Sequence, residues 1–181
     1  MKQAVLAILG LLLLLASPIM AEKFGVGVAV GPLIPIVQED QESGMVYAIK
    51  IRASLYGPLY FEPALQFGHF GDVTIGGIGS RVGSDLKSYG LDITLGGGNG
   101  KVGPKPYAFI GGGVYNMKRE YENATNKNGW SFGSGIAVGL MQRLDIDLRG
   151  RLNIVSSVEG ATRKSVGITA GAVYYFGREK E

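Results

Sequence analysis

The sequence predicts an all-β fold, namely a closed antiparallel eight-stranded barrel that spans a membrane. Three observations lead to this prediction. Apolar residues alternate with small or polar ones throughout the chain after residue 22, where no stretch keeps a helical period. No segment after that point is an apolar run of the roughly 20 residues that a spanning helix needs. Short connections between the alternating segments also alternate with long ones along the chain, as in barrels that have short turns on one side of a membrane and long loops on the other.

The N-terminus has the features of a secretory signal peptide. Lys2 precedes an apolar run over residues 4–16, and Ala21 is a small residue at a suitable cleavage point. The run is too short for a spanning helix. We therefore expect three parts: a signal peptide at residues 1–21, the barrel at 22–176 and a short periplasmic tail at 177–181.

The composition excludes several classes of protein. Without the signal peptide about 160 of the 181 residues remain, enough for one domain. The formal net charge of +3 includes Lys2, so that removal of Lys2 leaves +2, a balance that argues against a nucleic-acid binder. The chain has no cysteine, which excludes disulfides, thiolate metal ligands and a cysteine nucleophile.

Eight segments alternate with a period of two, which places successive side chains on opposite faces of a strand. The predicted strands are residues 24–31, 47–55, 59–68, 89–96, 107–118, 132–141, 144–154 and 166–176. The first has Phe or Val at its even positions and Gly or Ala at its odd positions. One of its faces is therefore bulky and apolar, and the other is nearly bare.

The second and third predicted strands are joined by a turn at Tyr56, Gly57 and Pro58. Each has one apolar face, and the pairing that this turn imposes sets Arg52 opposite Glu62 on the other face. Because facing β-carbons lie about 5 Å apart, we expect a salt bridge between these two residues. If the pair is buried, Arg52→Ala should destabilise the barrel by about 3 to 5 kcal/mol.

The fourth predicted strand has an apolar face that begins at Tyr89, while Asp92 lies among small residues on the other face. The fifth is ambiguous, because three glycines at 111–113 interrupt it. Either an aromatic set faces lipid or an aliphatic set does, and we favour the aromatic set without excluding the other. The aromatic set is Tyr107, Phe109, Tyr115 and Met117; the aliphatic set is Ala108, Ile110 and Val114.

The sixth predicted strand alternates apolar residues with glycines, and the seventh alternates apolar residues with charged ones. A tight turn at Gln142 and Arg143 joins them, so that glycines of one strand face charged side chains of the next. Small residues then make room for large ones. The eighth strand alternates apolar residues from Val166 to Phe176 with small or polar ones.

Four connections are long and polar, and we expect them to be the external loops, because the N-terminus stays in the periplasm after export. They are residues 38–44, 71–87, 119–128 and 156–164. The links after the second and sixth strands are short, as periplasmic turns are.

Alternation alone does not decide which face meets lipid, because a soluble barrel would turn its apolar face inward. The polar face is rich in glycine and alanine, as a narrow eight-stranded lumen requires, and its charges balance, as a desolvated interior demands. The predicted ion-pair network of the lumen is Lys50, Arg52, Glu62, Asp92, Asp145, Asp147, Arg149 and Arg151. Aromatic residues near strand ends suggest interfacial girdles: Phe24, Tyr56, Tyr60, Tyr89, Trp130, Tyr174 and Phe176.

The last strand resembles a known pattern. Thr169, Gly171, Tyr174 and Phe176 match the C-terminal signal of outer-membrane proteins, and residues 60–63 and 106–109 also look like segments of small barrels. The chain is thus similar to the OmpA transmembrane domain and OmpX. This resemblance implies a cell outer membrane location and recognition of the signal by the barrel-assembly machinery. Five residues follow Phe176, where the family usually ends on the aromatic, and we expect no OmpA-type peptidoglycan-binding domain.

No catalytic, cofactor or metal site is predicted, and we do not expect an enzyme. His69 is the only histidine. Barrel deacylases that modify lipid A resemble this architecture, but their His-x-Ser pattern is absent because Gly71 occupies the serine position. The glycine-rich stretches lack the Gly-Lys-Ser/Thr of a phosphate loop. We interpret them as turn and lumen packing.

Three functions fit these observations. The first is a structural and surface-interaction role, in adhesion or envelope integrity, with the external loops carrying the binding. The second is a narrow channel for ions or small solutes, and the third, which we expect least, is a lipid-modifying enzyme. Expected partners are outer-membrane lipids, lipopolysaccharide, the assembly machinery and a surface ligand of the loops, but no nucleic acid.

Overall fold

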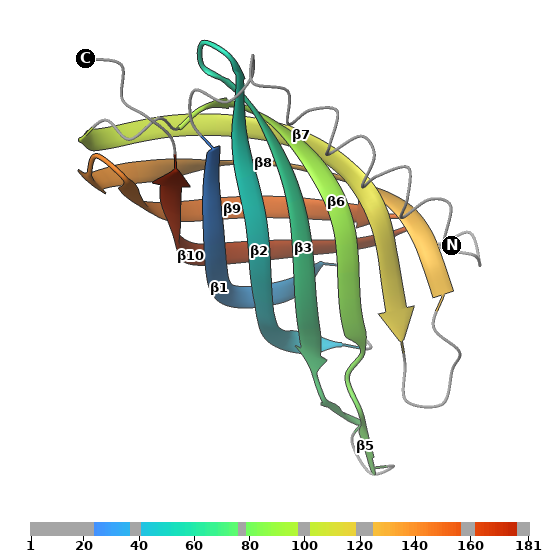
Figure 1. Ribbon diagram of the computed structural model, residues 1–181. Helices are drawn as coiled ribbons and strands as arrows, with labels where there is room; N and C mark the ends of the chain where they lie inside the picture. Colours follow the sequence, from blue (N-terminus) through green and yellow to red (C-terminus); the bar gives the residue numbers. More distant parts are fainter. Residues whose placement is uncertain are drawn as a thin grey trace.

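The computed structural model describes residues 24–36, 41–75, 79–97, 102–118, 125–156 and 162–176. Within these ranges, eight strands form a closed antiparallel barrel in the order β1-β10-β9-β8-β7-β6-β3-β2 (Figure 1). The barrel strands are β1 (Phe24–Ile36), β2 (Glu42–Tyr56), β3 (Leu59–Gly71), β6 (Asp85–Gly96), β7 (Gly103–Lys118), β8 (Thr125–Met141), β9 (Leu144–Val155) and β10 (Arg163–Phe176). The predicted all-β, eight-stranded barrel is confirmed.

The barrel closes where the first and last strands meet. β1 pairs with β10 along its length, from Phe24 opposite Phe176 to Ile36 opposite Lys164. Closure leaves no unpaired sheet edge, so that backbone N–H and C=O groups find partners within the barrel without water. The described part of the chain contains no helix of the length and hydropathy that crossing a membrane requires.

The apolar residues of the alternating pattern face outward. Ile49 and Leu148 are 47% and 51% exposed, whereas their neighbours Lys50 and Arg149 are 4% and 5% exposed. A barrel with an apolar exterior and charged residues inside is built for lipid, because each exposed apolar side chain gains free energy on leaving water. The predicted inside-out orientation is therefore confirmed.

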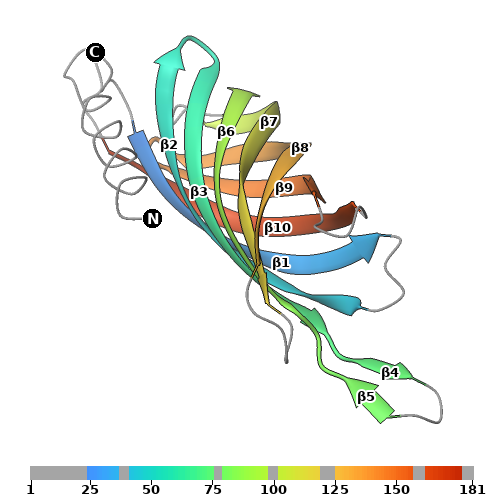
Figure 2. The same ribbon diagram turned by 90° about the vertical axis from the view of Figure 1, so that its right-hand side faces the viewer.

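The two ends of the barrel differ. One, the turn end, carries the tight turns at Gly57–Pro58 and Gln142–Arg143, and Gly57 adopts a left-handed φ of 55°. The opposite end, the loop end, carries a two-stranded hairpin between β3 and β6, formed by β4 (Val73–Ile75) and β5 (Gly79–Arg81). This hairpin projects beyond the barrel wall (Figure 2).

Strands extend further at the loop end than the alternation predicts. β2 begins at Glu42, β6 at Asp85, β8 at Thr125 and β10 at Arg163, each inside a stretch that was expected to be an external loop. Apolar alternation requires lipid on one side of the strand. Strand residues beyond the lipid keep the hydrogen-bonded ladder but have no need of an apolar face, so the sequence pattern ends before the strand does.

Two predicted facings are wrong. Tyr107, Phe109 and Tyr115 of β7 point into the lumen, where 4%, 6% and 3% of their surface is exposed, while Ile110 is 60% exposed on the outside. The aliphatic set thus faces lipid. Tyr60, expected in an interfacial girdle, is 2% exposed, because its position in β3 has the parity of the lumen residue Glu62.

Candidate functional site

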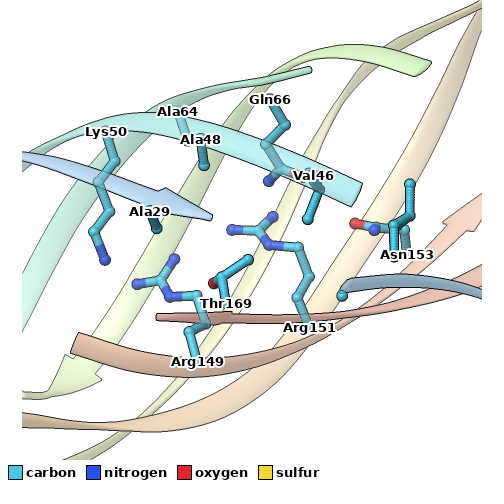
Figure 3. A pocket seen from close by; sticks show the side chains of 12 residues that line it. Ala29, Val46, Ala48, Lys50, Ala64, Gln66, Arg149, Arg151, Asn153 and Thr169 are labelled. Atoms are coloured by element: carbon cyan, nitrogen blue, oxygen red, sulfur yellow. The ribbon is translucent and has the colours of Figure 1, made fainter. Parts of the chain in front are cut away.

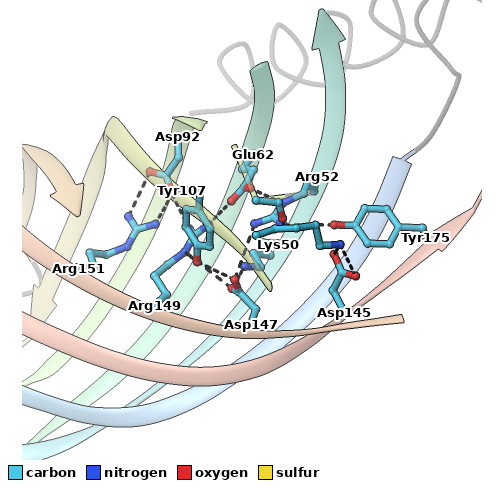
Figure 4. A network of polar contacts seen from close by, with 12 residues as sticks. Lys50, Arg52, Glu62, Asp92, Tyr107, Asp145, Asp147, Arg149, Arg151 and Tyr175 are labelled. Atoms are coloured by element: carbon cyan, nitrogen blue, oxygen red, sulfur yellow. Dashed lines mark hydrogen bonds and ion pairs between the residues drawn. The ribbon is translucent and has the colours of Figure 1, made fainter. Parts of the chain in front are cut away.

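The lumen contains a hydrogen-bonded network of charged side chains that joins strands on opposite sides of the barrel (Figure 4). All eight residues predicted for it are buried in the lumen. They come from β2, β3, β6 and β9; β3 and β6 supply one each, and those of β2 and β9 take every second position. The parity of these four strands therefore brings residues up to 97 positions apart in the sequence into contact.

Arg52 and Glu62 form the pair that the turn between β2 and β3 predicts. Arg52 Nε donates to Glu62 Oε1, and both side chains are fully buried. Arg52 Nη1 also donates to the carbonyl oxygen of Gly97 at 2.7 Å and to the hydroxyl of Tyr175 at 3.2 Å. This guanidinium thereby ties β2 to β3, to the segment after β6 and to β10 near the turn end.

Arg149 connects the two sides of the lumen. Its Nη2 donates to the second oxygen of Glu62, and its Nη1 donates to Asp92 Oδ2 at 3.1 Å. Its Nε donates to the hydroxyl of Tyr107 at 3.0 Å. Glu62 therefore accepts from a guanidinium on each of its oxygens, one from β2 and one from β9.

Asp92 is shared by two arginines. Arg151 Nη2 donates to Asp92 Oδ2, and Arg151 Nη1 lies 3.2 Å from Asp92 Oδ1 and 2.9 Å from Ser131 Oγ. With Arg149 on the same carboxylate, β6, β8 and β9 are held together by one cluster. Arginine suits this role because its planar fork presents several donors at fixed angles.

Two lysines complete the network. Lys50 Nζ donates to Asp147 Oδ2, and Tyr107 donates its hydroxyl proton to Asp147 Oδ1 at 2.6 Å. Lys105 lies 2.8 Å from each oxygen of Asp145. Lys105 keeps 14% of its side-chain surface exposed, so this pair borders solvent while the others do not.

Aromatic rings lie against the guanidinium groups. The carbon at the centre of the Arg149 guanidinium is 4.5 Å from the Phe109 ring centre and 5.1 Å from that of Tyr107, and the same carbon of Arg151 is 4.8 Å from Phe109. Cations gain electrostatic stabilisation over a ring face, and more so where water is excluded. These cation–ring contacts explain why Tyr107 and Phe109 of β7 face the lumen.

Glycines on β8 provide the space for these large groups. Tyr107 pairs with Gly135 in register, and Gly135 in turn pairs with Arg149 on β9. A β-carbon at Gly135 would lie 2.4 Å from the Tyr107 hydroxyl oxygen and 2.5 Å from the carbonyl oxygen of Leu148. The glycine face of β8 therefore accommodates both an aromatic neighbour and a charged one.

A second layer, the apolar cluster, fills the lumen nearer the loop end. Its buried members are Leu33, Val46, Phe70, Leu86, Tyr115 and Val155, with Met117 packed against them. These buried members lie on the lumen parity of their strands, and all of them except Tyr115 lie beyond the ends of the strands that the sequence predicts. In the described part of the barrel, the lumen is therefore crossed first by a polar layer and then by an apolar one.

His69 lies outside the lumen, near the loop end of β3. Its Nδ1 is 2.8 Å from Asp85 Oδ1 of β6, and both side chains are more than half exposed. Among the described residues no hydroxyl group hydrogen-bonds to His69. No cluster of three or more His, Asp or Glu side chains with metal-binding geometry occurs in the same ranges.

The sequence interpretation missed four members of the network, Lys105, Tyr107, Ser131 and Tyr175. Tyr107 and Lys105 share the parity of Gly111 and Gly113, and glycines mark the lumen face in the neighbouring strands. Applying that rule to β7 would have placed them inside. Tyr175 lies on the small-residue face of β10 and was not singled out.

The predicted assembly-signal residues lie on both faces of β10. Tyr174 and Phe176 point outward, each 43% exposed, with their rings in edge contact at 4.9 Å, and Phe176 stacks on Phe24 at 5.1 Å. Thr169 and Gly171 have the opposite parity and are partly buried. The aromatic half of the signal thus sits on the lipid side of the seam between β1 and β10.

No known family model matches the chain, and no curated protein matches its sequence. Solved structures do match. The Neisserial surface protein A, NspA, is 14% identical with a TM-score of 0.65, covering 86% of this chain and 98% of that chain. Ail, the attachment invasion locus protein of Yersinia pestis, is 13% identical with a TM-score of 0.52, covering 87% and 100%.

An enzyme is also among the matching structures. The outer membrane enzyme PagL is 13% identical with a TM-score of 0.50, covering 83% of this chain and 98% of that chain. At such identities the likeness concerns the fold, which serves proteins with and without catalytic activity. Together with the apolar exterior and the closed barrel, it shows that this chain has the fold of the eight-stranded outer-membrane β-barrels, similar in architecture to the small barrels of the OmpA and OmpX type.

Proposed function

We propose that this chain is a non-conducting barrel that acts at the cell surface, in adhesion or envelope integrity, through the segments at its loop end. The observation that carries the proposal is the filled lumen, in which the polar network and the apolar cluster lie one above the other. A scaffold with a filled interior offers its exposed loops for binding, as rigid scaffolds commonly do.

The filled lumen argues against the narrow channel. An ion crossing it would have to separate buried ion pairs and then pass an apolar constriction, and apolar constrictions exclude water. We expect no steady conductance from the purified protein in planar bilayers, and none from Glu62→Gln. A measurable wild-type conductance that Glu62→Gln alters would favour the channel instead.

The hairpin of β4 and β5 is the part of the described loop end that projects furthest from the barrel (Figure 2). Ail, which has the same fold, is described as an attachment protein, which supports a binding role for such segments. Replacing residues 72–84 with a short turn should leave the barrel folded and reduce adhesion of cells that display it. Equal surface display has to be verified by antibody; unchanged adhesion at equal display would count against the hairpin as the binding segment.

A lipid-modifying enzyme is the second candidate, favoured by the His69–Asp85 pair, since a carboxylate that orients a histidine is part of many hydrolytic sites. The pair lies on the outer surface, near the loop end. Mass spectrometry of lipid A from cells with wild-type protein, His69→Ala or no protein tests it. We expect identical lipid profiles, and a modification that His69→Ala abolishes would establish the enzyme.

We propose further that the barrel-assembly machinery reads Thr169, Gly171, Tyr174 and Phe176. Phe176 is 43% exposed at the end of β10, and its ring contacts the rings of Phe24 and Tyr174 on the lipid side. Phe176→Ala should lower the fraction of assembled barrel in cells while refolding from urea into micelles proceeds as in wild type. Equal loss in both settings would point to stability instead of recognition.

A further inference from the structure

A cavity remains in the lumen between the polar network and the apolar cluster. Its volume is about 30 Å³. A water molecule needs roughly 10 to 15 Å³ by the same measure, so the space suits about two waters or one small ion. Ala48, Ala64 and Gly167 form the walls where side chains are short, and Arg149 and Arg151 extend into it from β9 (Figure 3).

The charge around this cavity has one sign. Twelve described residues line it, and three of them, Lys50, Arg149 and Arg151, are cationic, whereas none is acidic. The carboxylates that pair with these cations lie outside the lining. The other polar residues of the wall, among them Thr169 and Gln66, are neutral. The cavity is therefore lined by hydrogen-bond donors of the cationic side chains and by no carboxylate.

Charge also fails to balance in the network as a whole. Asp145 gives both oxygens to Lys105 at the border with solvent. The four remaining cations, Lys50, Arg52, Arg149 and Arg151, then face three carboxylates, Glu62, Asp92 and Asp147. An uncompensated buried charge is costly, and the excess here is one positive charge.

Donor groups at the cavity have capacity left. An ammonium carries three N–H groups, and Lys50 uses one of them in a hydrogen bond, to Asp147. Arg149 engages one N–H on each of its three nitrogens, although the two terminal nitrogens carry two each. When its amide is turned so that the oxygen faces Arg151, Gln66 accepts from that guanidinium at 3.2 Å, but an amide neutralises no charge.

We propose that this cavity binds one small inorganic anion of halide size, chloride under ordinary conditions, as the missing counterion of the lumen network. Lys50, Arg149 and Arg151 supply the charge, and the volume excludes larger anions such as sugar acids. Binding to the folded barrel alone stabilises it in proportion to the logarithm of the anion concentration. The site is structural and lies inside the barrel, apart from the loop segments proposed for surface binding.

The direct test uses bromide, which replaces chloride and scatters anomalously. Crystals of the detergent-solubilised barrel grown in sodium bromide should show an anomalous peak in the cavity, in contact with Lys50 and at least one of the two arginines. Peaks on the surface alone would mean an adventitious ion only. That result, or a cavity without any anomalous peak, would overturn the proposal.

A solution test uses two matched glycine variants. A β-carbon at Gly167 would have Val46 as its nearest neighbour at 3.8 Å, so that Gly167→Ala adds a methyl group to the cavity wall without a clash. Gly150 is equally unhindered, with its nearest atom also at 3.8 Å, but it faces outward. Gly150→Ala therefore controls for the substitution itself.

We expect the urea midpoint of the wild type and of Gly150→Ala in micelles to rise as sodium chloride replaces sodium gluconate at constant ionic strength. Gly167→Ala should lose most of that rise, because its methyl group takes up the anion's space. The same rise in all three proteins, or no rise in the wild type, would refute a specific anion site in the cavity.

Discussion

Glu62 is the residue on which the network depends most. It is fully buried, and its two oxygens accept hydrogen bonds from Arg52 and Arg149. One carboxylate therefore pairs with two buried guanidinium groups. Glu62→Gln keeps the shape and removes the charge. We expect the free energy of unfolding in micelles to fall by about 3 to 5 kcal/mol, the usual cost of breaking a buried ion pair from one side.

Asp85→Asn is the matched control for that substitution. It makes the same change from acid to amide in a pair with His69 whose members are 55% and 56% exposed. Exposed ion pairs contribute at most about 1 kcal/mol, so the unfolding midpoint should hardly move. Similar losses in the two variants would show that the lumen is hydrated.

The contribution of the Tyr107 hydroxyl to stability can be measured apart from that of its ring. It donates to Asp147 at 2.6 Å and accepts from Arg149 at 3.0 Å, and Tyr107→Phe removes both bonds while keeping the ring beneath the guanidinium. Hydrogen bonds to charged groups contribute about 1.5 to 3 kcal/mol, and a loss of that order is expected in urea titrations. Tyr89→Phe, on the 54% exposed outer face, should be neutral; a neutral Tyr107→Phe would mean that water replaces the hydroxyl.

Eight of the nine charged members of the network could be read from the sequence, because strand parity places them on one face; Lys105, which precedes the predicted fifth strand, was missed. The aromatic members of the network do not declare their facing by residue type. A tyrosine suits a polar lumen as well as a lipid interface, and it is the parity that Tyr107 shares with Gly111 and Gly113, together with its register beside Gly135 and Arg149, that separates the two. Position in the barrel, not residue type, decides the facing of Tyr60 and Tyr107.

The glycines of β8 show how one strand shapes its neighbours. Gly135→Ala would place a methyl group 2.5 Å from the backbone oxygen of Leu148, which cannot move without disturbing the pairing of β8 with β9. We expect a lower yield of folded barrel, measured as the fraction that migrates as the compact form in unheated gel samples. Gly150→Ala, with open space around its β-carbon, should fold as wild type does. Normal folding of Gly135→Ala would imply that β9 can move away from β8.

The eight barrel strands were predictable, whereas their lengths and the hairpin of β4 and β5 were not. Alternation reports the lipid-facing belt, whereas the ladder of β2, β3 and β6 continues beyond it toward the hairpin of β4 and β5. The apolar cluster was also hidden, because Leu33, Val46 and Leu86 lie beyond the predicted strands and only the longer strands of the structure assign them to the lumen. Sequence patterns therefore locate the membrane belt better than they locate the ends of the barrel.

The orientation of the whole barrel can be tested with its single tryptophan. Trp130 lies on the outer face of β8 and is 67% exposed, next to Ile154 of β9 in register. In bilayers its fluorescence should be quenched by lipids brominated on their acyl chains and resist iodide in the water, because girdle aromatics sit at the membrane boundary. Moving the reporter two residues along β8, with Trp130→Phe and Phe132→Trp combined, should shift the strongest quenching to bromines nearer the bilayer centre. Quenching by iodide alone, in a protein that stays dispersed without detergent, would mean that water, not lipid, surrounds the apolar face.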